Sequence, residues 1–251
     1  MANFEIDYSK VYNPSKAEIR RVDEMAARHP IGGLIVPATI TDSMLMGDAR
    51  GSAAIPQTVD CMDFCLPAKD QGIKPWCAAY AAASYLENIL FRRTHIPQSV
   101  DPTWIYEYAK KVDGLPNEEG TSIPAVLQAL LAYKCFGENK CQIKTLRTLD
   151  HVLMALHQQQ ACLLGLNVSK EWYACNTKKT AIYAQKGCDK TQVGGHCVLC
   201  VGAIRDQGLL VRNSWGDKWG FYGTSIISFA EFRRQFLYGG VVDGVLDGMR
   251  L

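Results

Sequence analysis

Residues 70–93 read DQGIKPWCAAYAAASYLENILFRR, and this stretch decides how the chain is organised. After the helix breaker Pro75, the run from Cys77 to Arg93 contains strong helix formers and neither Gly nor Pro. It predicts a long central helix that begins at Cys77. The Cys77 sulfur would then lie near unpaired N–H groups and the positive end of the helix dipole, which favours the reactive thiolate. A lone cysteine at a helix start is more often structural, so catalysis would require a partner.

A histidine and an asparagine further along the chain could supply that partner. His196 begins the strand-like run HCVLCVGAI, and the next strand-like run, at 208–214, carries Asn213. A tight turn between the two runs predicts a hairpin that lets Asn213 approach His196. A Cys–His pair needs a third group to orient the imidazole, and an Asn side-chain oxygen can do this. Together with Cys77, these residues predict a catalytic triad, although each alone would more often be structural.

The rest of the chain divides into a helical first half and a strand-rich second half. Further helices are predicted after the capping residues Thr121-Ser122 and over 149–159. Strands are predicted at 162–168 and in the hairpin that follows. Such segregation predicts an α+β protein with a helical lobe, a sheet lobe and a cleft between them.

The first 55 residues are predicted to form an N-terminal extension, with the main domain at 56–251. Residues 15–28 have an apolar face and the capping-box spacing of Ser15 and Glu18, which is typical of an amphipathic helix. From residue 29 to 56 several Gly and Pro residues occur without a sustained period. This composition favours an extended connector over a packed domain.

Composition and charge argue against several classes of function. The 251 residues are 48% hydrophobic and 21% charged, which is typical of soluble globular domains. The formal charge of +2 and the scattered Lys and Arg do not indicate a nucleic-acid partner, and no apolar run is long enough to span a membrane. Because the N-terminus lacks a classical export signal, we expect a soluble protein that is cytoplasmic or exported by a specialised secretion system.

Ten cysteines leave the redox compartment open. Two close pairs have spacings compatible with zinc ligands, Cys61 with Cys65 and Cys197 with Cys200. The second pair lies in a strand-like run rather than a ligand turn, so we expect no metal site. Cys175 and Cys188 lie in one loop-rich segment and could form a disulfide in an oxidising compartment.

The motifs around the three candidate residues resemble the papain family of cysteine peptidases. Gln71-Gly72 resembles the family's Gln-Gly pair, with the Gln six positions before Cys77. The histidine strand is similar as well, and Asn213-Ser-Trp-Gly-Asp-Lys-Trp-Gly220 matches the family's Asn-Ser-Trp-Gly-x-x-Trp-Gly signature. The order Gln, Cys, His, Asn is also the family's order. The resemblance extends over roughly residues 56–240.

This resemblance implies a two-lobe papain-like fold, with a helical lobe and an antiparallel sheet or barrel. It implies an endopeptidase that hydrolyses peptide bonds through a covalent acyl-enzyme, with no metal or organic cofactor. Cys77 would be the nucleophile, His196 the acid and base, and Asn213 the orienting residue. Gln71 would donate a side-chain N–H to the oxyanion hole, beside the backbone N–H of Cys77. Trp215 would cover the bond between Asn213 and His196.

Other positions match the family pattern less closely. Gly120 would be the bare backbone that pairs with an extended substrate, although the family's Cys-Asn-Gly-Gly is missing before it. Pro75-Trp76 replaces two small residues beside the oxyanion hole, which makes Trp76 a candidate substrate contact. The upstream cysteine of the usual Cys-Gly-Ser-Cys-Trp is absent, and with it the disulfide that it makes. Val59-Asp60 and Asp70-Gln71-Gly72 resemble the bacterial, xylellain-like branch.

Family enzymes carry an inhibitory segment directly before the matching region, so residues 1–55 are predicted to act as a built-in inhibitor of a zymogen. The helix would dock on one lobe, and the extended part would cross the cleft near Cys77. Alternatively, the extension packs away from the site. The expected partner is a peptide or protein substrate. The same triad could instead serve transglutaminase, acyltransferase or deamidase chemistry, or remain in an inactive peptide-binding module.

Overall fold

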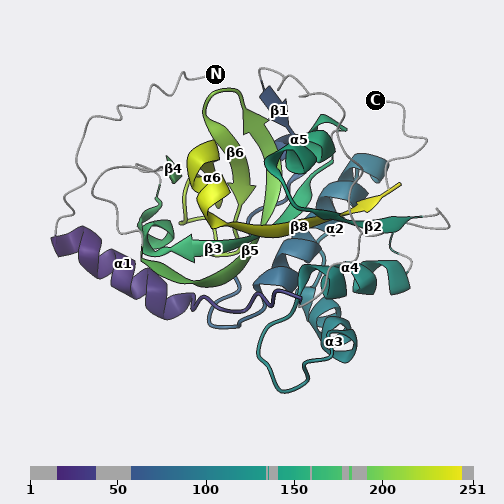
Figure 1. Cartoon of the computed structure of the whole chain (residues 1–251), viewed down its shortest axis with the longest axis horizontal. Helices are drawn as coiled ribbons and strands as arrows, with labels where there is room; N and C mark the ends of the chain where they lie inside the picture. Colours follow the sequence, from purple (N-terminus) through teal and green to yellow (C-terminus); the bar gives the residue numbers. More distant parts are fainter. Residues whose placement is uncertain are drawn as a thin grey trace.

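Helices and a mostly antiparallel sheet lie side by side in the molecule (Figure 1). The computed structural model describes residues 16–37, 58–133, 135, 141–158, 160–176, 181–182 and 191–244. The predicted α+β fold with a helical and a sheet lobe is confirmed.

The helical lobe is built around a central helix, as the sequence predicted. Its three helices are α2 (Cys77–Thr94), α3 (Pro102–Val112) and α4 (Ile123–Ala132). The alanines in the first turns of α2 are buried, and their small side chains let the helix pack closely against α3, α4 and the sheet strand β5 (Gln192–Ile204). Cys77, in the first turn, therefore lies where the two lobes meet.

The two shorter helices begin where the sequence supplies caps. Asp101 accepts the backbone N–H of Thr103 at the start of α3, and Ser122 accepts that of Ala125 at the start of α4. Each cap is followed by a proline in the first turn, where a missing N–H does no harm. The cap of α4 fixes the chain that precedes it, at residues 120–121.

The strands of the sheet lobe follow the order β2-β8-β3-β5-β6-β7-β4, with β1 paired to β5. Besides β5, they are β1 (Thr58–Asp60), β2 (Gln142–Leu146), β3 (Cys162–Ser169), β4 (Ala181–Ile182), β6 (Gly208–Arg212), β7 (Thr224–Ser228) and β8 (Phe236–Asp243). All pairings are antiparallel except that of β4 with β7. In the described residues β2 and β4 end the order without pairing, so the sheet is open and not a closed barrel.

Short helices complete the fold, and strand β5 divides the hydrophobic core. These helices are η2 (Met62–Phe64), α5 (Leu149–His157), η3 (Lys170–Ala174) and α6 (Phe229–Gln235). Cys197 and Leu199 of β5 pack into the core shared with α2 to α4, whereas Val198 and Cys200 face a second core within the sheet lobe. This alternation is the period-two pattern of a strand buried on both faces.

The predicted N-terminal helix is present as α1 (Lys16–Arg28), and it packs against η3 of the sheet lobe. Arg21 donates a hydrogen bond to the carbonyl of Ala174 at 2.7 Å. From α1 the chain runs toward the helical lobe (Figure 1). The connector after residue 37, the domain boundary near residue 55 and Cys188 of the suggested disulfide lie outside the described residues.

The described part of the chain holds neither a cluster of metal-ligating side chains nor a membrane-spanning helix. In it, no three side chains of His, Cys, Asp or Glu gather in a way that could hold a metal ion. None of its helices combines the length and the apolar character needed to cross a membrane.

Candidate active site

A hydrogen bond joins two of the three predicted triad residues. His196 lies on β5 and Asn213 directly follows β6, so the β5–β6 hairpin brings them together. The Nε2 atom of His196 lies 2.8 Å from Asn213 Oδ1, which also accepts the backbone N–H of Ser214 at 2.8 Å. Because an amide oxygen only accepts, Nε2 carries the proton of the neutral ring, and Nδ1 carries a lone pair.

Cys77 reaches the same place from the helical lobe. Its sulfur lies in the first turn of α2, near the backbone N–H of Cys197, which follows His196 on β5 and lowers the pKa of the thiol. The thiol therefore lies beside the strand that carries the histidine. At the junction of the lobes the structure thus joins His196 to Asn213 and places Cys77 near the residue that follows His196.

Burial dominates the ionisation of both reactive groups. Cys77 is 1% exposed, and burial raises its pKa to about 11, although backbone N–H groups such as that of Cys197 lower it. Burial lowers the pKa of His196 to about 4, against the hydrogen bond of Asn213, and nearby His29 lowers it further. The N–H groups at the helix start lower the pKa of Cys77, as the sequence predicts, but desolvation outweighs them while the thiol is buried.

Aromatic rings enclose the imidazole of His196. Trp215 lies against it with ring centroids 4.9 Å apart, and Trp172 meets it edge-on at 6.2 Å. Trp219 stacks on Trp172 at 5.7 Å and donates its indole N–H to the Trp172 carbonyl at 2.7 Å. Trp215 is 2% exposed, so this shell keeps water from the bond between His196 and Asn213.

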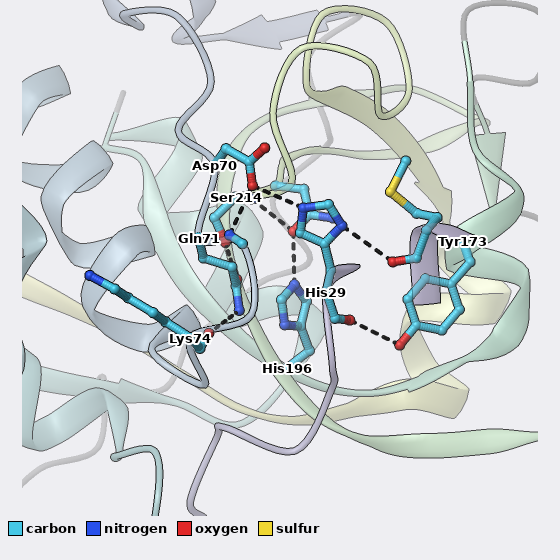
Figure 2. Close-up of polar contacts among 10 residues, drawn as sticks. His29, Asp70, Gln71, Lys74, Tyr173, His196 and Ser214 are labelled. Carbon is cyan, nitrogen blue, oxygen red and sulfur yellow. Dashed lines mark hydrogen bonds and ion pairs between the residues drawn. The ribbon is translucent and has the colours of Figure 1, made fainter. Parts of the chain in front are cut away.

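Gln71 lies near His196 and is held by Ser214 (Figure 2). The Ser214 hydroxyl donates to Gln71 Oε1 at 2.6 Å, and the Gln71 backbone N–H donates to the Ser214 carbonyl at 2.8 Å. Gln71 Nε2 donates to the Lys74 carbonyl at 2.8 Å, and an amide carries two such hydrogens. Ser214 was not predicted as a site residue, although its place next to Asn213 in the signature could have indicated it.

Residues 29–37, which belong to the predicted N-terminal extension, run through the site between the lobes. On the helical side, the N–H of Ile35 donates to the Thr121 carbonyl and the N–H of Thr121 donates to the Gly33 carbonyl, both at 3.0 Å. On the sheet side, the N–H of Gly32 donates to the carbonyl of Gly195 at 3.1 Å. We call residues 29–37 the cleft segment.

The middle of the cleft segment fits tightly against the site. A Cβ added at Gly33 would collide with the carbonyl of Pro75, two residues before Cys77, so only glycine allows this approach. Leu34 is 6% exposed and belongs to the same hydrophobic cluster as Cys77. A Cβ at Gly165 would lie 2.7 Å from Leu34 Cδ2, so a glycine also makes room for this side chain.

His29 fixes the start of the cleft segment (Figure 2). Its Nε2 lies 2.9 Å from Asp70 Oδ1, and its ring stacks on Trp215 at 5.6 Å. The carbonyl of His29 accepts the hydroxyl of Tyr173 at 3.2 Å. These contacts tie the segment to residues next to Gln71 and to the aromatic shell of His196.

The two other predicted contact residues lie in different settings. Gly120 has a positive φ of 90° and faces the Gly33 carbonyl, where a Cβ would collide. It therefore lines the path of an extended chain. Trp76 stacks on Tyr106 of α3 at 4.2 Å, with the Lys74 ammonium 4.3 Å from its ring centroid. Its ring is packed on the helical lobe.

Two curated proteins are similar to this chain in sequence. An uncharacterized peptidase C1-like protein of Acanthamoeba polyphaga mimivirus is 32% identical over 76 residues, 30% of this chain and 24% of that protein. The oryzain gamma chain of Oryza sativa subsp. japonica is 28% identical over 216 residues, 74% of this chain and 58% of that protein. The match thus spans less than two thirds of each relative. No family model matches the chain.

Solved structures are similar over most of the chain. Xylellain, a cysteine protease from Xylella fastidiosa, has a TM-score of 0.69 and 19% identity, over 86% of this chain and 97% of that one. Procathepsin B from Trypanosoma congolense has a TM-score of 0.60 and 15% identity, over 91% and 88% of the two chains. The chain therefore has the papain-like fold of these cysteine proteases, which confirms the resemblance inferred from its motifs.

Proposed function

We propose that the chain is a cysteine endopeptidase with Cys77 as nucleophile, His196 as acid and base, and Asn213 as orienting residue. The observation that carries the proposal is the hydrogen bond between His196 and Asn213 beside a cysteine at a helix start. The names of one curated relative, a peptidase C1-like protein, and of one structural neighbour, a cysteine protease, support it.

The geometry supports a two-step acyl transfer. With Nε2 bound to Asn213, His196 presents Nδ1 to the thiol and takes its proton once the cleft is open. The thiolate attacks the scissile carbonyl, and His196 returns the proton to the leaving amine, which leaves an acyl-enzyme on Cys77. His196 then activates a water molecule, which hydrolyses the thioester and frees Cys77. The backbone N–H of Cys77 and the second N–H of Gln71 would stabilise the oxyanion.

The cleft segment would hold the enzyme latent, because it occupies the path of a substrate and keeps Cys77 buried. A tethered segment sees an effective concentration in the millimolar range, so weak contacts suffice to keep it in place. This assigns an inhibitory role to the part of residues 1–55 that the structure describes.

Incubation with a diverse peptide library tests the reaction class. Mass spectrometry would identify cleaved peptides, amine-transfer products and deamidated glutamines in one experiment. Cleavage as the main product supports the peptidase. Transfer or deamidation as the main product would assign the triad to one of the alternative chemistries, and no turnover by a chain with an open cleft would favour a binding module.

Gln71→Ala is expected to lower kcat by about 10²-fold and to change KM little, because one oxyanion donor is lost. Peptide hydrolysis by the full-length chain near pH 6.5, where about half of His196 in the open form is still neutral, measures this. Ser214→Ala should give a smaller loss of kcat, since Ser214 only orients the Gln71 amide. A loss confined to KM would mean that Gln71 binds substrate in the ground state instead.

Acid is expected to open the cleft. The pKa of His196 is about 4 when closed, whereas an exposed histidine titrates near 6.5. Opening therefore takes up a proton at pH values between these two, and the closed form loses stability as pH falls from about 6.5 to 4. Amide exchange of residues 29–37, corrected for its intrinsic pH dependence, should show protection falling over this range.

The control is His196→Gln, which removes the titrating group and should flatten the pH profile. Cys77 makes the opening of the cleft depend on pH in the alkaline range, because its pKa of about 11 in the closed form lies above the ordinary value near 9.0. Opening then releases a proton above about pH 9, so protection should fall again in alkali. Constant protection from neutral to acid pH would contradict the role of His196.

A further inference from the structure

A buried ion pair lies at the end of α3, outside the catalytic group. Lys110 Nζ is 2.8 Å from Asp113 Oδ2, and the two side chains are 16% and 1% exposed. A buried pair of this kind contributes little net stability, because desolvation of both charges offsets their attraction. Its contacts with the neighbouring backbone give it a different significance.

Both partners hold the chain at residues 120–121. The Lys110 ammonium donates to the Gly120 carbonyl at 3.1 Å and to the Leu115 carbonyl at 2.7 Å, so its three hydrogens have partners. The Asp113 carboxylate accepts the Thr121 hydroxyl at 3.0 Å and the Leu115 N–H at 3.0 Å. The pair thus grips Gly120 and Thr121 from one side, by a carbonyl and by a hydroxyl.

The other side of the same two residues faces the cleft. Thr121 makes two backbone hydrogen bonds of 3.0 Å with the cleft segment, through Gly33 and Ile35. Gly120 meets the Gly33 carbonyl so closely that a Cβ would collide. A small shift of this backbone would therefore break its pairing with an extended chain.

The Asp113 carboxylate can hold residues 120–121 over a wide pH range. Burial raises its pKa, but the hydrogen bonds from Lys110, Leu115 and Thr121 outweigh burial, and the pKa is lowered overall. The group thus stays ionised, and keeps accepting hydrogen bonds, at the acid pH that opens the cleft.

We propose that Lys110 and Asp113 are positioning residues that fix the Gly120–Thr121 backbone as the edge on which an extended chain pairs in the cleft. In the closed form that chain is the cleft segment. For a peptide substrate the inference rests on the proposed peptidase function. The ion pair would then set how tightly the cleft binds an extended backbone, without taking part in bond cleavage.

Two readouts on the full-length chain test this. The first is amide exchange of residues 31–37, which reports pairing of the cleft segment. The second is the rate of Cys77 labelling by a peptidyl epoxide divided by its rate with iodoacetamide. Both reagents need an open cleft, so opening cancels in the ratio, and only the peptidyl reagent pairs with Thr121.

The variants are Asp113→Asn and Lys110→Met, with Thr121→Val and Thr121→Ser as a milder couple that keeps the ion pair. Loss of the hydrogen bonds from Lys110 and Asp113 to residues 120–121 is expected to speed amide exchange at 31–37 about tenfold. It is also expected to lower the labelling ratio about tenfold, as for the loss of one or two hydrogen bonds. Thr121→Ser keeps the hydroxyl and should behave as the parent. Arg234→Met is the matched control, because it removes the cation from buried Glu231 at a distant ion pair.

Faster exchange at 31–37 with parent-like exchange in α2, together with a lower ratio, supports the proposal. Parent-like exchange at 31–37 and a parent-like ratio in Asp113→Asn and Thr121→Val overturn it, as does faster exchange throughout the chain in Thr121→Val. If exchange at 31–37 responds but the peptidyl epoxide never labels Cys77, the positioning role of Lys110 and Asp113 holds for the closed form. The proposed peptidase function then fails.

Discussion

Cys77→Ala is expected to abolish peptide hydrolysis, with kcat lower by about 10⁶-fold, because removal of the nucleophile of a triad costs about as much as removal of the whole triad. The fold should persist, since Cys77 lies among small buried side chains and loses one sulfur atom. Hydrolysis by the full-length chain near pH 6.5, with the unfolding midpoint measured alongside, checks both statements.

The matched control is Cys162→Ala, another buried cysteine on β3. It carries the same loss of volume without touching the triad, so its hydrolysis should stay near that of the parent. Retention of substantial hydrolysis in Cys77→Ala would contradict the assignment of the nucleophile. Asn213→Ala should fall between the two, because it orients His196 without reacting itself.

The elements predicted correctly are those with strong local signals. The alanine-rich run after Pro75 indicated α2, and Ser122 with the following proline indicated α4. Helix α3 was not predicted, because its sequence PTWIYEYAKKV mixes helix formers with aromatic and β-branched residues. The capping residue Asp101 is the clearer signal of its start. Strand β5 begins at Gln192, four residues before the predicted start, because pairing with β3 extends it through two glycines.

The site could be predicted as a set of residues but not in its present state. Cys77, His196 and Asn213 carry recognisable motifs, and motif order alone indicated that they meet. Their pKa values depend on which atoms surround them, and the sequence does not tell that residues 29–37 lie in the cleft rather than elsewhere. The support given by Ser214, Lys110 and Asp113 likewise arises from tertiary contacts between separate segments.

Leu34→Asp is expected to raise the rate of Cys77 labelling by iodoacetamide on the order of 10³-fold in the full-length chain. Leu34 is 6% exposed in the cluster that contains Cys77, so the closed form would have to bury an unpaired carboxylate. The effective penalty is several kcal/mol, and about 4 kcal/mol corresponds to 10³ in the population of open cleft. Labelling rates by mass spectrometry measure that population.

Val36→Asp is the matched control. It adds the same charge two residues further along the cleft segment, at a side chain that is 50% exposed. Its labelling rate should stay within about threefold of the parent, since an exposed substitution changes stability by about 0.5 kcal/mol. The comparison separates displacement of the cleft segment from any general effect of a negative charge on the thiol. Equal rates in Leu34→Asp and Val36→Asp would mean that the segment does not control access to Cys77. A high rate only in Leu34→Asp would show that the buried leucine keeps the cleft segment in place. A segment that still fits rebinds readily, because its covalent link to the enzyme gives it a high effective concentration.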